Sequence, residues 1–126
     1  MPNIYCMGPK EFFDSLDAAV RASLGPDFAF SVAKEGDRRE YAYQGMLVSA
    51  GMYDDARGFI DGIMASPDPG ASQIKGDRRL FEGPHHNRIF PLNEASLEFA
   101  TECVRAWLSL DATAIQTLRN AAFNSG

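Results

Sequence analysis

Hydrophobic positions along the chain follow two different periods, and both ends of the chain have the period of a helix. In residues 8–25, Phe12, Leu16 and Val20 recur every four residues and place their side chains on one helix face. Pro9 suits the first helical position, where its missing N–H has no partner to lose. A Gly-Pro pair ends the pattern. We therefore expect an N-terminal helix with one apolar face.

The strongest helical pattern covers residues 93–110, near the C-terminus. Asn93 is placed to cap its N-terminus. Its apolar positions form two adjoining rows that, with Trp107, cover roughly 200° of the helix surface. So wide an apolar arc predicts a helix at the centre of the core. Asp111 is then placed to cap a last helix over 112–123.

Residues 27–44 change to a period of two, which is typical of a strand. The alternation of aromatic residues on both sides of "KEGD" predicts a β-hairpin that turns at Glu35-Gly36. A turn there would place Val32 opposite Arg39, Phe30 opposite Tyr41 and Phe28 opposite Tyr43. The alternative is a helix that begins at Asp37, with Glu40 closing a capping box.

The middle of the chain is harder to assign. Residues 45–52 fit either an extension of the second strand or a short helix. Residues 53–65, "YDDARGFIDGIMA", are predicted to be helical because their apolar residues share a face at helical spacing. Gly58 and Gly62 weaken that helix by about 1 kcal/mol each relative to Ala, and as a pair they would let another backbone approach closely.

The stretch "GMYDDARGFIDGIMASP" resembles the second half of a tetratricopeptide repeat over about one helix. No second copy follows at the period of that repeat, so we predict no repeat architecture. Residues 72–91 fit irregular structure or short strands. Helices at both ends with strands between them predict an α+β fold, in which helices pack on a small antiparallel sheet. An all-α arrangement is the alternative.

Composition limits the class of protein. The chain has 126 residues, 45% of them hydrophobic, which fits one globular domain over 1–126. Its formal net charge of −5 argues against direct nucleic-acid binding, since that requires a basic face. No signal peptide or membrane-spanning run is found, so we expect a cytoplasmic protein. Cys6 and Cys103 are expected to be buried thiols, although one bridge between them stays open.

Basic residues gather in one place on this acidic chain. The sequence "GDRR" occurs at 36–39 and again at 76–79, and turn amides beside arginine suit phosphate or carboxylate. The segment 72–91 has four Lys or Arg and two acids, a local charge of +2, and it contains both histidines. The predicted ligand-binding residues are Lys75, Arg78, Arg79, His85, His86 and Arg88, with Arg38 and Arg39 from the first turn.

Signatures of catalysis or metal binding are missing from the sequence. Adjacent histidines diverge on a helix or a strand and lack the spacing of helical zinc pairs, so we expect no metal and no cofactor. Asp54 and Asp55 are interpreted as helix-opening acids. Glu11, Asp14 and Asp17 are interpreted as a solvated helix flank.

Three functions are compatible with the sequence. The first is a small acidic, non-catalytic interaction protein (an inhibitor, immunity, anti-defence or regulatory factor) that binds a larger protein partner. The second is a binder of a small anionic ligand, such as a nucleotide, through the basic segment 75–88. The third is a small enzyme that uses His85 or His86. Whether the chain forms a homo-oligomer is left open.

Overall fold

The computed structural model describes residues 7–64, 79–81 and 87–124, with side chains described up to residue 120. Within these ranges the chain forms three helices and five strands. In chain order they are α1 (Pro9–Leu24), β1 (Ser31–Glu35), β2 (Arg38–Tyr43), β3 (Met46–Met52), β4 (Arg57–Met64), β5 (Arg88–Pro91), α2 (Glu94–Leu108) and α3 (Ala112–Asn124).

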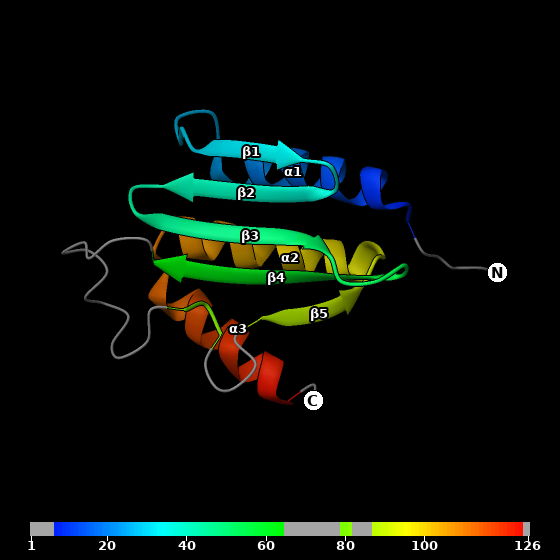
Figure 1. Ribbon diagram of the computed structural model, residues 1–126. Coiled ribbons are helices and arrows are strands. Elements are labelled where there is room, and N and C mark those ends of the chain that lie inside the picture. The colour runs from blue at the N-terminus through cyan, green and yellow to red at the C-terminus, as the bar shows by residue number, and fades with distance from the viewer. Residues whose placement is uncertain (1–6, 65–78, 82–86, 125–126) are drawn as a thin grey trace.

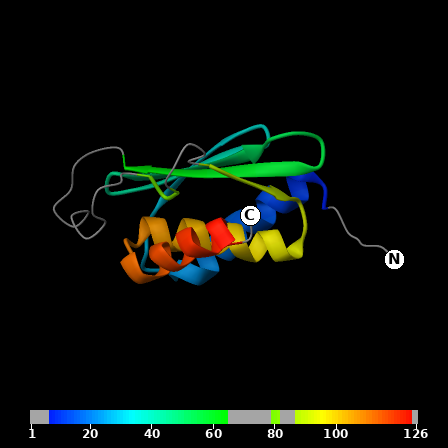
Figure 2. The same ribbon diagram turned by 90° about the horizontal axis from the view of Figure 1, so that it is seen from below.

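The strands form one antiparallel sheet in the order β1-β2-β3-β4-β5, so each strand pairs with its neighbour in sequence. The three helices lie together against one face of this sheet (Figures 1 and 2). The predicted α+β class is confirmed, and the all-α alternative is wrong. The hydrophobic core lies between the helix layer and the sheet.

Both predicted N-terminal elements are present. Helix α1 begins at Pro9, and Gly25 ends it with a φ of +89°, a conformation that glycine adopts without strain. The expected apolar face is buried, and Phe13 is buried beside it. One more residue of α1 is buried that the sequence placed on a solvated flank: Asp17 is only 7% exposed. That interpretation of Asp17 is wrong, because the side chain turns toward the sheet.

The hairpin of β1 and β2 is confirmed, but its predicted register is wrong by two residues. Val32 pairs with Tyr41 rather than with Arg39. The loop consists of Gly36 and Asp37, and the φ of +62° at Gly36 suits the first position of a type II′ turn. A shift of two residues leaves every side chain on its predicted face. The expected aromatic pairs therefore still meet, with ring centroids 4.1 Å apart for Phe28–Tyr43 and 6.1 Å apart for Phe30–Tyr41.

The residues from 45 to 52, which the sequence left open, are a strand. Gln44 and Gly45 both have positive φ, 45° and 85°, as in the two-residue turns that connect hairpin strands. Strand β3 then pairs with β2 on one side and β4 on the other. The helix proposed to start at Asp37 is absent, because these residues belong to the hairpin.

The predicted helix over 53–65 is wrong, since residues 53–64 form a tight turn and strand β4. The likeness to a tetratricopeptide helix therefore does not extend to the structure. Gly58 and Gly62 both lie on the helix-facing side of β4, where they make room for close packing. A Cβ at Gly62 would stand 2.7 Å from the Cβ of Leu80 and 3.1 Å from Trp107. Two glycines that disfavour a helix are thus required by the packing of a strand.

The C-terminal helices agree with the sequence. Asn93 caps α2 through its side-chain oxygen, which accepts a hydrogen bond from the Ser96 amide at 2.9 Å. Asp111 caps α3 in the same way, at 3.1 Å from the Ala114 amide. Trp107 is fully buried, and its indole N–H donates to the Ile63 carbonyl at 3.3 Å. Helix α2 is the central helix, and it packs against both α1 and α3.

Cys103 is a buried free thiol, and burial raises its pKa well above the usual value. Cys6 lies outside the described residues. None of the helices in the described ranges is both long enough and apolar enough to cross a membrane.

Candidate functional site

Four of the predicted ligand-binding residues, Lys75, Arg78, His85 and His86, lie outside the described residues. The basic site around 75–88 and the use of either histidine in catalysis therefore stay predictions. Arg38, Arg39, Arg79 and Arg88 lie within the described ranges, and the structure places each of them.

Arg39 is a buried residue of the interface between α1 and β2, only 4% exposed. Its guanidinium donates to Asp17 at 3.1 Å, to Asp14 at 2.8 Å and to the Gly36 carbonyl at 2.9 Å. Tyr41, on the same face of β2, donates to the other oxygen of Asp17 at 2.5 Å. Burial, followed by this bond to Asp17, raises the pKa of Tyr41 far above its usual range and keeps the hydroxyl protonated. This network fastens the first GDRR turn to α1.

The neighbouring Arg38 is exposed on the opposite face of β2, where it forms an ion pair with Glu40 at 3.3 Å. Arg79, from the second GDRR sequence, lies beside Ile63 of β4 and pairs with Asp61 at 3.4 Å. Arg38 is beside the first turn of the sheet, whereas Ile63 is near the far end of β4. The structure therefore does not bring Arg79 beside the first GDRR turn.

Arg119 of α3 binds the backbone of Arg79 and Leu80. Arg119, which is 5% exposed, donates to the Leu80 carbonyl at 2.8 Å and also to the Arg79 carbonyl. Arg88 is half-buried at the start of β5 and pairs in register with Ile60, a core residue. Arg88 thus lies on the helix-facing side of the sheet.

The side of the sheet away from the helices, called the open face below, is covered by no helix in the described part of the chain (Figure 2). An antiparallel sheet with one face in water normally carries polar residues there. On β3, β4 and β5 the outward positions are instead largely apolar. They are Leu47, Ser49, Gly51, Phe59, Asp61, Ile63 and Ile89, with Arg57 and Pro91 at the ends of their strands and Tyr53 in the turn after β3.

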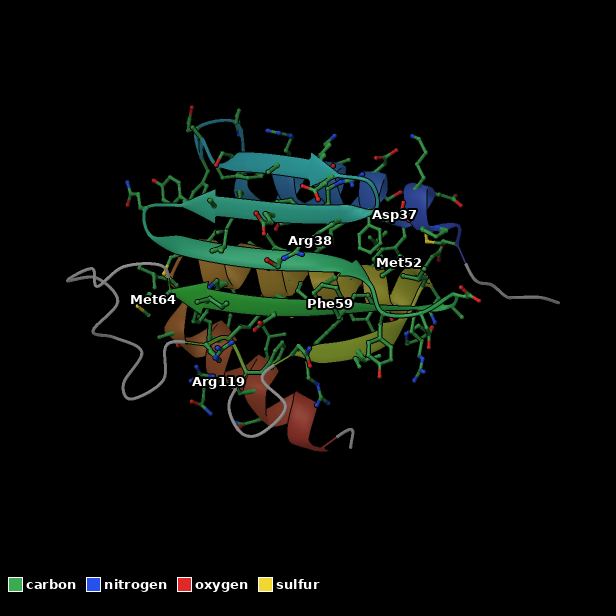
Figure 3. The ribbon with its side chains drawn as sticks, viewed as in Figure 1. Asp37, Arg38, Met52, Phe59, Met64 and Arg119 are labelled. Carbon is green, nitrogen blue, oxygen red and sulfur yellow. The ribbon has the colours of Figure 1, made fainter. Side chains whose placement is uncertain are left out.

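Large apolar side chains meet on this face at one corner. Among the described residues, Tyr53 at 54% and Ile89 at 40% are the exposed large hydrophobic residues, and both lie on the open face. Phe59 lies between them, directly opposite Ile89 and two positions along from Tyr53 in the register of β3 and β4. We call Tyr53, Phe59 and Ile89 the apolar patch. Arg38 and Phe59 mark the side of the sheet that faces the viewer in Figure 3.

The apolar patch is held in a defined arrangement. The Phe59 ring lies over Gly51, where a Cβ would stand 3.1 Å from it, so the glycine leaves room for the ring. The Arg57 guanidinium lies 5.1 Å from the Tyr53 ring centroid and is itself bound by Asp54 at 2.5 Å. Asp54 also accepts hydrogen bonds from the Ala56 and Arg57 amides and so orders the turn. A pre-ordered aromatic side chain loses little entropy on binding.

The sequence reasoning missed the apolar patch because it assigned residues 53–65 to a helix. On a helix, Phe59 and Ile63 would face the core together with Ile60. The alternation of Gly58, Ile60 and Gly62 with Phe59, Asp61 and Ile63 was the signal of a strand with two dissimilar faces. In the described residues, no group of three His, Cys, Asp or Glu side chains is arranged to hold a metal ion.

Comparisons with known proteins add no family to this picture. No protein-family model, curated protein or solved structure matches the chain.

Proposed function

We propose that this chain is a non-catalytic interaction protein that binds a larger protein partner through its open face. The inhibitor, immunity, anti-defence and regulatory classes all belong to this proposal. The observation that carries it is the apolar patch of Tyr53, Phe59 and Ile89 on a sheet face that no described helix covers. Adjacent exposed apolar side chains are typical of binding surfaces, whereas isolated ones occur on any protein.

The chemistry of the patch supports this proposal. Tyrosine and arginine are enriched among the residues that contribute most to binding at protein interfaces, and here Tyr53 and Arg57 are adjacent. Tyr53 lies in the β3–β4 turn and Arg57 begins β4, and Asp54 orders this turn by side-chain bonds to the backbone. A surface that is ordered before binding favours a stable complex, because fewer side chains must be immobilised.

The proposal is tested by photo-crosslinking in the cells that make the protein. A benzophenone amino acid replaces Ile89 on the open face, and in a control protein it replaces Gln116, which is exposed on α3. We expect one discrete covalent adduct with a partner protein from position 89 and none of that mass from position 116. The additional substitution Tyr53→Asp should abolish the adduct without lowering the melting temperature.

Identical adducts from positions 89 and 116, or no adduct from position 89, would contradict binding through the open face. An adduct from position 89 that survives Tyr53→Asp would mean that the partner contacts β5 without contacting Tyr53.

A further inference from the structure

The apolar patch continues into a row of side chains that crosses the open face to the other edge of the sheet. Register places Glu35 opposite Arg38, Gly51 opposite Phe59, and Phe59 opposite Ile89. Arg38 and Gly51 are also adjacent, since a Cβ at Gly51 would stand 3.6 Å from the Arg38 Cα. The row therefore runs from an acidic residue on β1 to apolar residues on β4 and β5.

Among the described residues on and beside this row, carboxylates outnumber arginines. The arginines are paired within the protein, Arg38 with Glu40 at 3.3 Å and Arg57 with Asp54 at 2.5 Å. The hydrogen bond from Arg57 lowers the pKa of Asp54, so that pair stays ionised at neutral pH.

Three further carboxylates at the same end of the sheet remain. Glu35 is the last residue of β1, Asp37 belongs to the β1–β2 turn, and Asp55 belongs to the β3–β4 turn beside Tyr53. All three are exposed, and within the described part of the chain none of them forms an ion pair or a side-chain hydrogen bond. Within the described ranges, these three carboxylates therefore give this end of the sheet a net negative charge.

A shallow depression lies at the acidic end of the row, over the β1–β2 hairpin. It is lined by Ala33, Lys34, Glu35, Arg38 and Glu40. Its lysine is engaged on the helix side by Asp17 at 3.2 Å. Arg38 is engaged by Glu40 at 3.3 Å, so Glu35 is left to accept hydrogen bonds from a basic side chain that enters the depression.

We infer that the partner presents a basic segment to the open face, with an apolar side chain on the apolar patch and an Arg or Lys at Glu35. This inference rests on the proposed function and names the chemistry of the partner. Phe59 and Glu35 are three strands apart, about 14 Å at the usual strand spacing. An extended segment advances about 3.3 Å per residue, so the apolar and basic residues are about four positions apart.

The test uses a synthetic peptide as the probe, acetyl-Gly-Trp-Gly-Ser-Gly-Arg-Lys-Gly-amide, in which Trp and Arg are four positions apart. A second peptide carries two Glu in place of Arg and Lys. Binding to the full chain is measured by NMR titration. We expect the basic peptide to shift the amides of 35–38, 51–59 and 89, and the acidic peptide to leave them unchanged. Added salt should weaken binding, because exposed charges are screened.

Two matched variants separate charge at the site from net charge. Glu35→Gln, Asp37→Asn and Asp55→Asn together should weaken binding of the basic peptide about tenfold, equivalent to 1.4 kcal/mol. Glu11→Gln, Asp27→Asn and Glu98→Gln change the net charge by the same amount on exposed helix and loop positions. This control should leave the affinity within about twofold of the unchanged protein.

The inference would be overturned if the two variants weakened binding of the basic peptide equally, or if the amide shifts were confined to the helices. Absence of binding by the basic peptide would also overturn it. None of these outcomes decides whether the open face binds a partner. The crosslinking experiment decides that, because a specific adduct at position 89 does not depend on the charge of the partner. A specific adduct together with unchanged affinity in the acid-neutralised variant means that the open face binds a partner of different chemistry.

Discussion

At the scale of single residues, neighbours in the sequence have opposite environments. Arg38 and Arg39 are adjacent in the same GDRR sequence, and a strand directs them to opposite faces of the sheet. Arg38 is exposed on the open face, while Arg39 is buried against α1 with two carboxylates. A buried guanidinium is tolerated because its donors are satisfied by these carboxylates.

Replacement of these two arginines should therefore have very different effects on stability. Arg39→Ala should lower the free energy of unfolding by about 3 kcal/mol, because the buried Asp17 loses its buried cation and keeps only the exposed ammonium of Lys34 as an opposite charge. Arg38→Ala should change it by less than about 0.5 kcal/mol, the range for an exposed ion pair. Urea unfolding at neutral pH measures both. A loss below about 1 kcal/mol for Arg39→Ala would mean that water reaches Asp17.

At the scale of elements, β4 shows how the parts of the chain that pack against a segment decide its conformation. Residues 57–64 contain Phe and Ile at spacings that fit a helix as well as a strand. The two glycines fit only the strand, because α2 and the segment 79–81 pack directly on its inner face. The Leu80 amide even donates to the Gly62 carbonyl at 2.8 Å.

The substitution Gly62→Ala distinguishes the two conformations by the sign of its effect. In a helix, alanine would stabilise by about 1 kcal/mol relative to glycine. In β4, the added methyl would stand 2.7 Å from Leu80, so we expect a loss of about 1–3 kcal/mol. Thermal unfolding measures the change. Gly8→Ala serves as the control, since a Cβ there meets nothing within 4 Å; equal effects of the two substitutions would contradict the close packing at Gly62.

At the scale of the whole molecule, the strands of the sheet differ in how well they are protected against local opening. β3 has a strand on both sides and lies against α2, and four of its seven residues, Met46, Val48, Ala50 and Met52, face the core. β1 has only one neighbouring strand, and four of its five residues are exposed. Stability against local opening follows burial and the number of pairing partners.

Hydrogen exchange should follow this order. We expect the backbone amides of β3 to exchange more slowly than those of β1 by at least about a hundredfold, which corresponds to about 2.7 kcal/mol between local and wider opening. Exchange followed by NMR at neutral pH measures the ratio for each amide. Equal protection of β1 and β3 would mean that the sheet opens only as a unit, or that another chain pairs with the edge of β1 in solution.

The elements that the sequence predicted correctly are those whose hydrogen bonds are local. Residues close together in the sequence define the apolar faces of the three helices, the caps at Asn93 and Asp111 and the helix ends. The β1–β2 hairpin was predicted for the same reason, since its alternation and its glycine turn are adjacent in the chain. Its register was not, because a turn one position later preserves the same pattern of faces.

The predicted ligand-binding residues show the corresponding limit for the site. The sequence alone determined that this chain is acidic, that its basic residues gather near 75–88 and that it combines helices with a sheet. The burial of Arg39 and Asp17, the strand conformation of β4 and the exposure of Tyr53 and Ile89 were decided only by the tertiary structure. A strand obtains its hydrogen bonds and its buried face from distant segments, so no local pattern fixes which of its faces remains open.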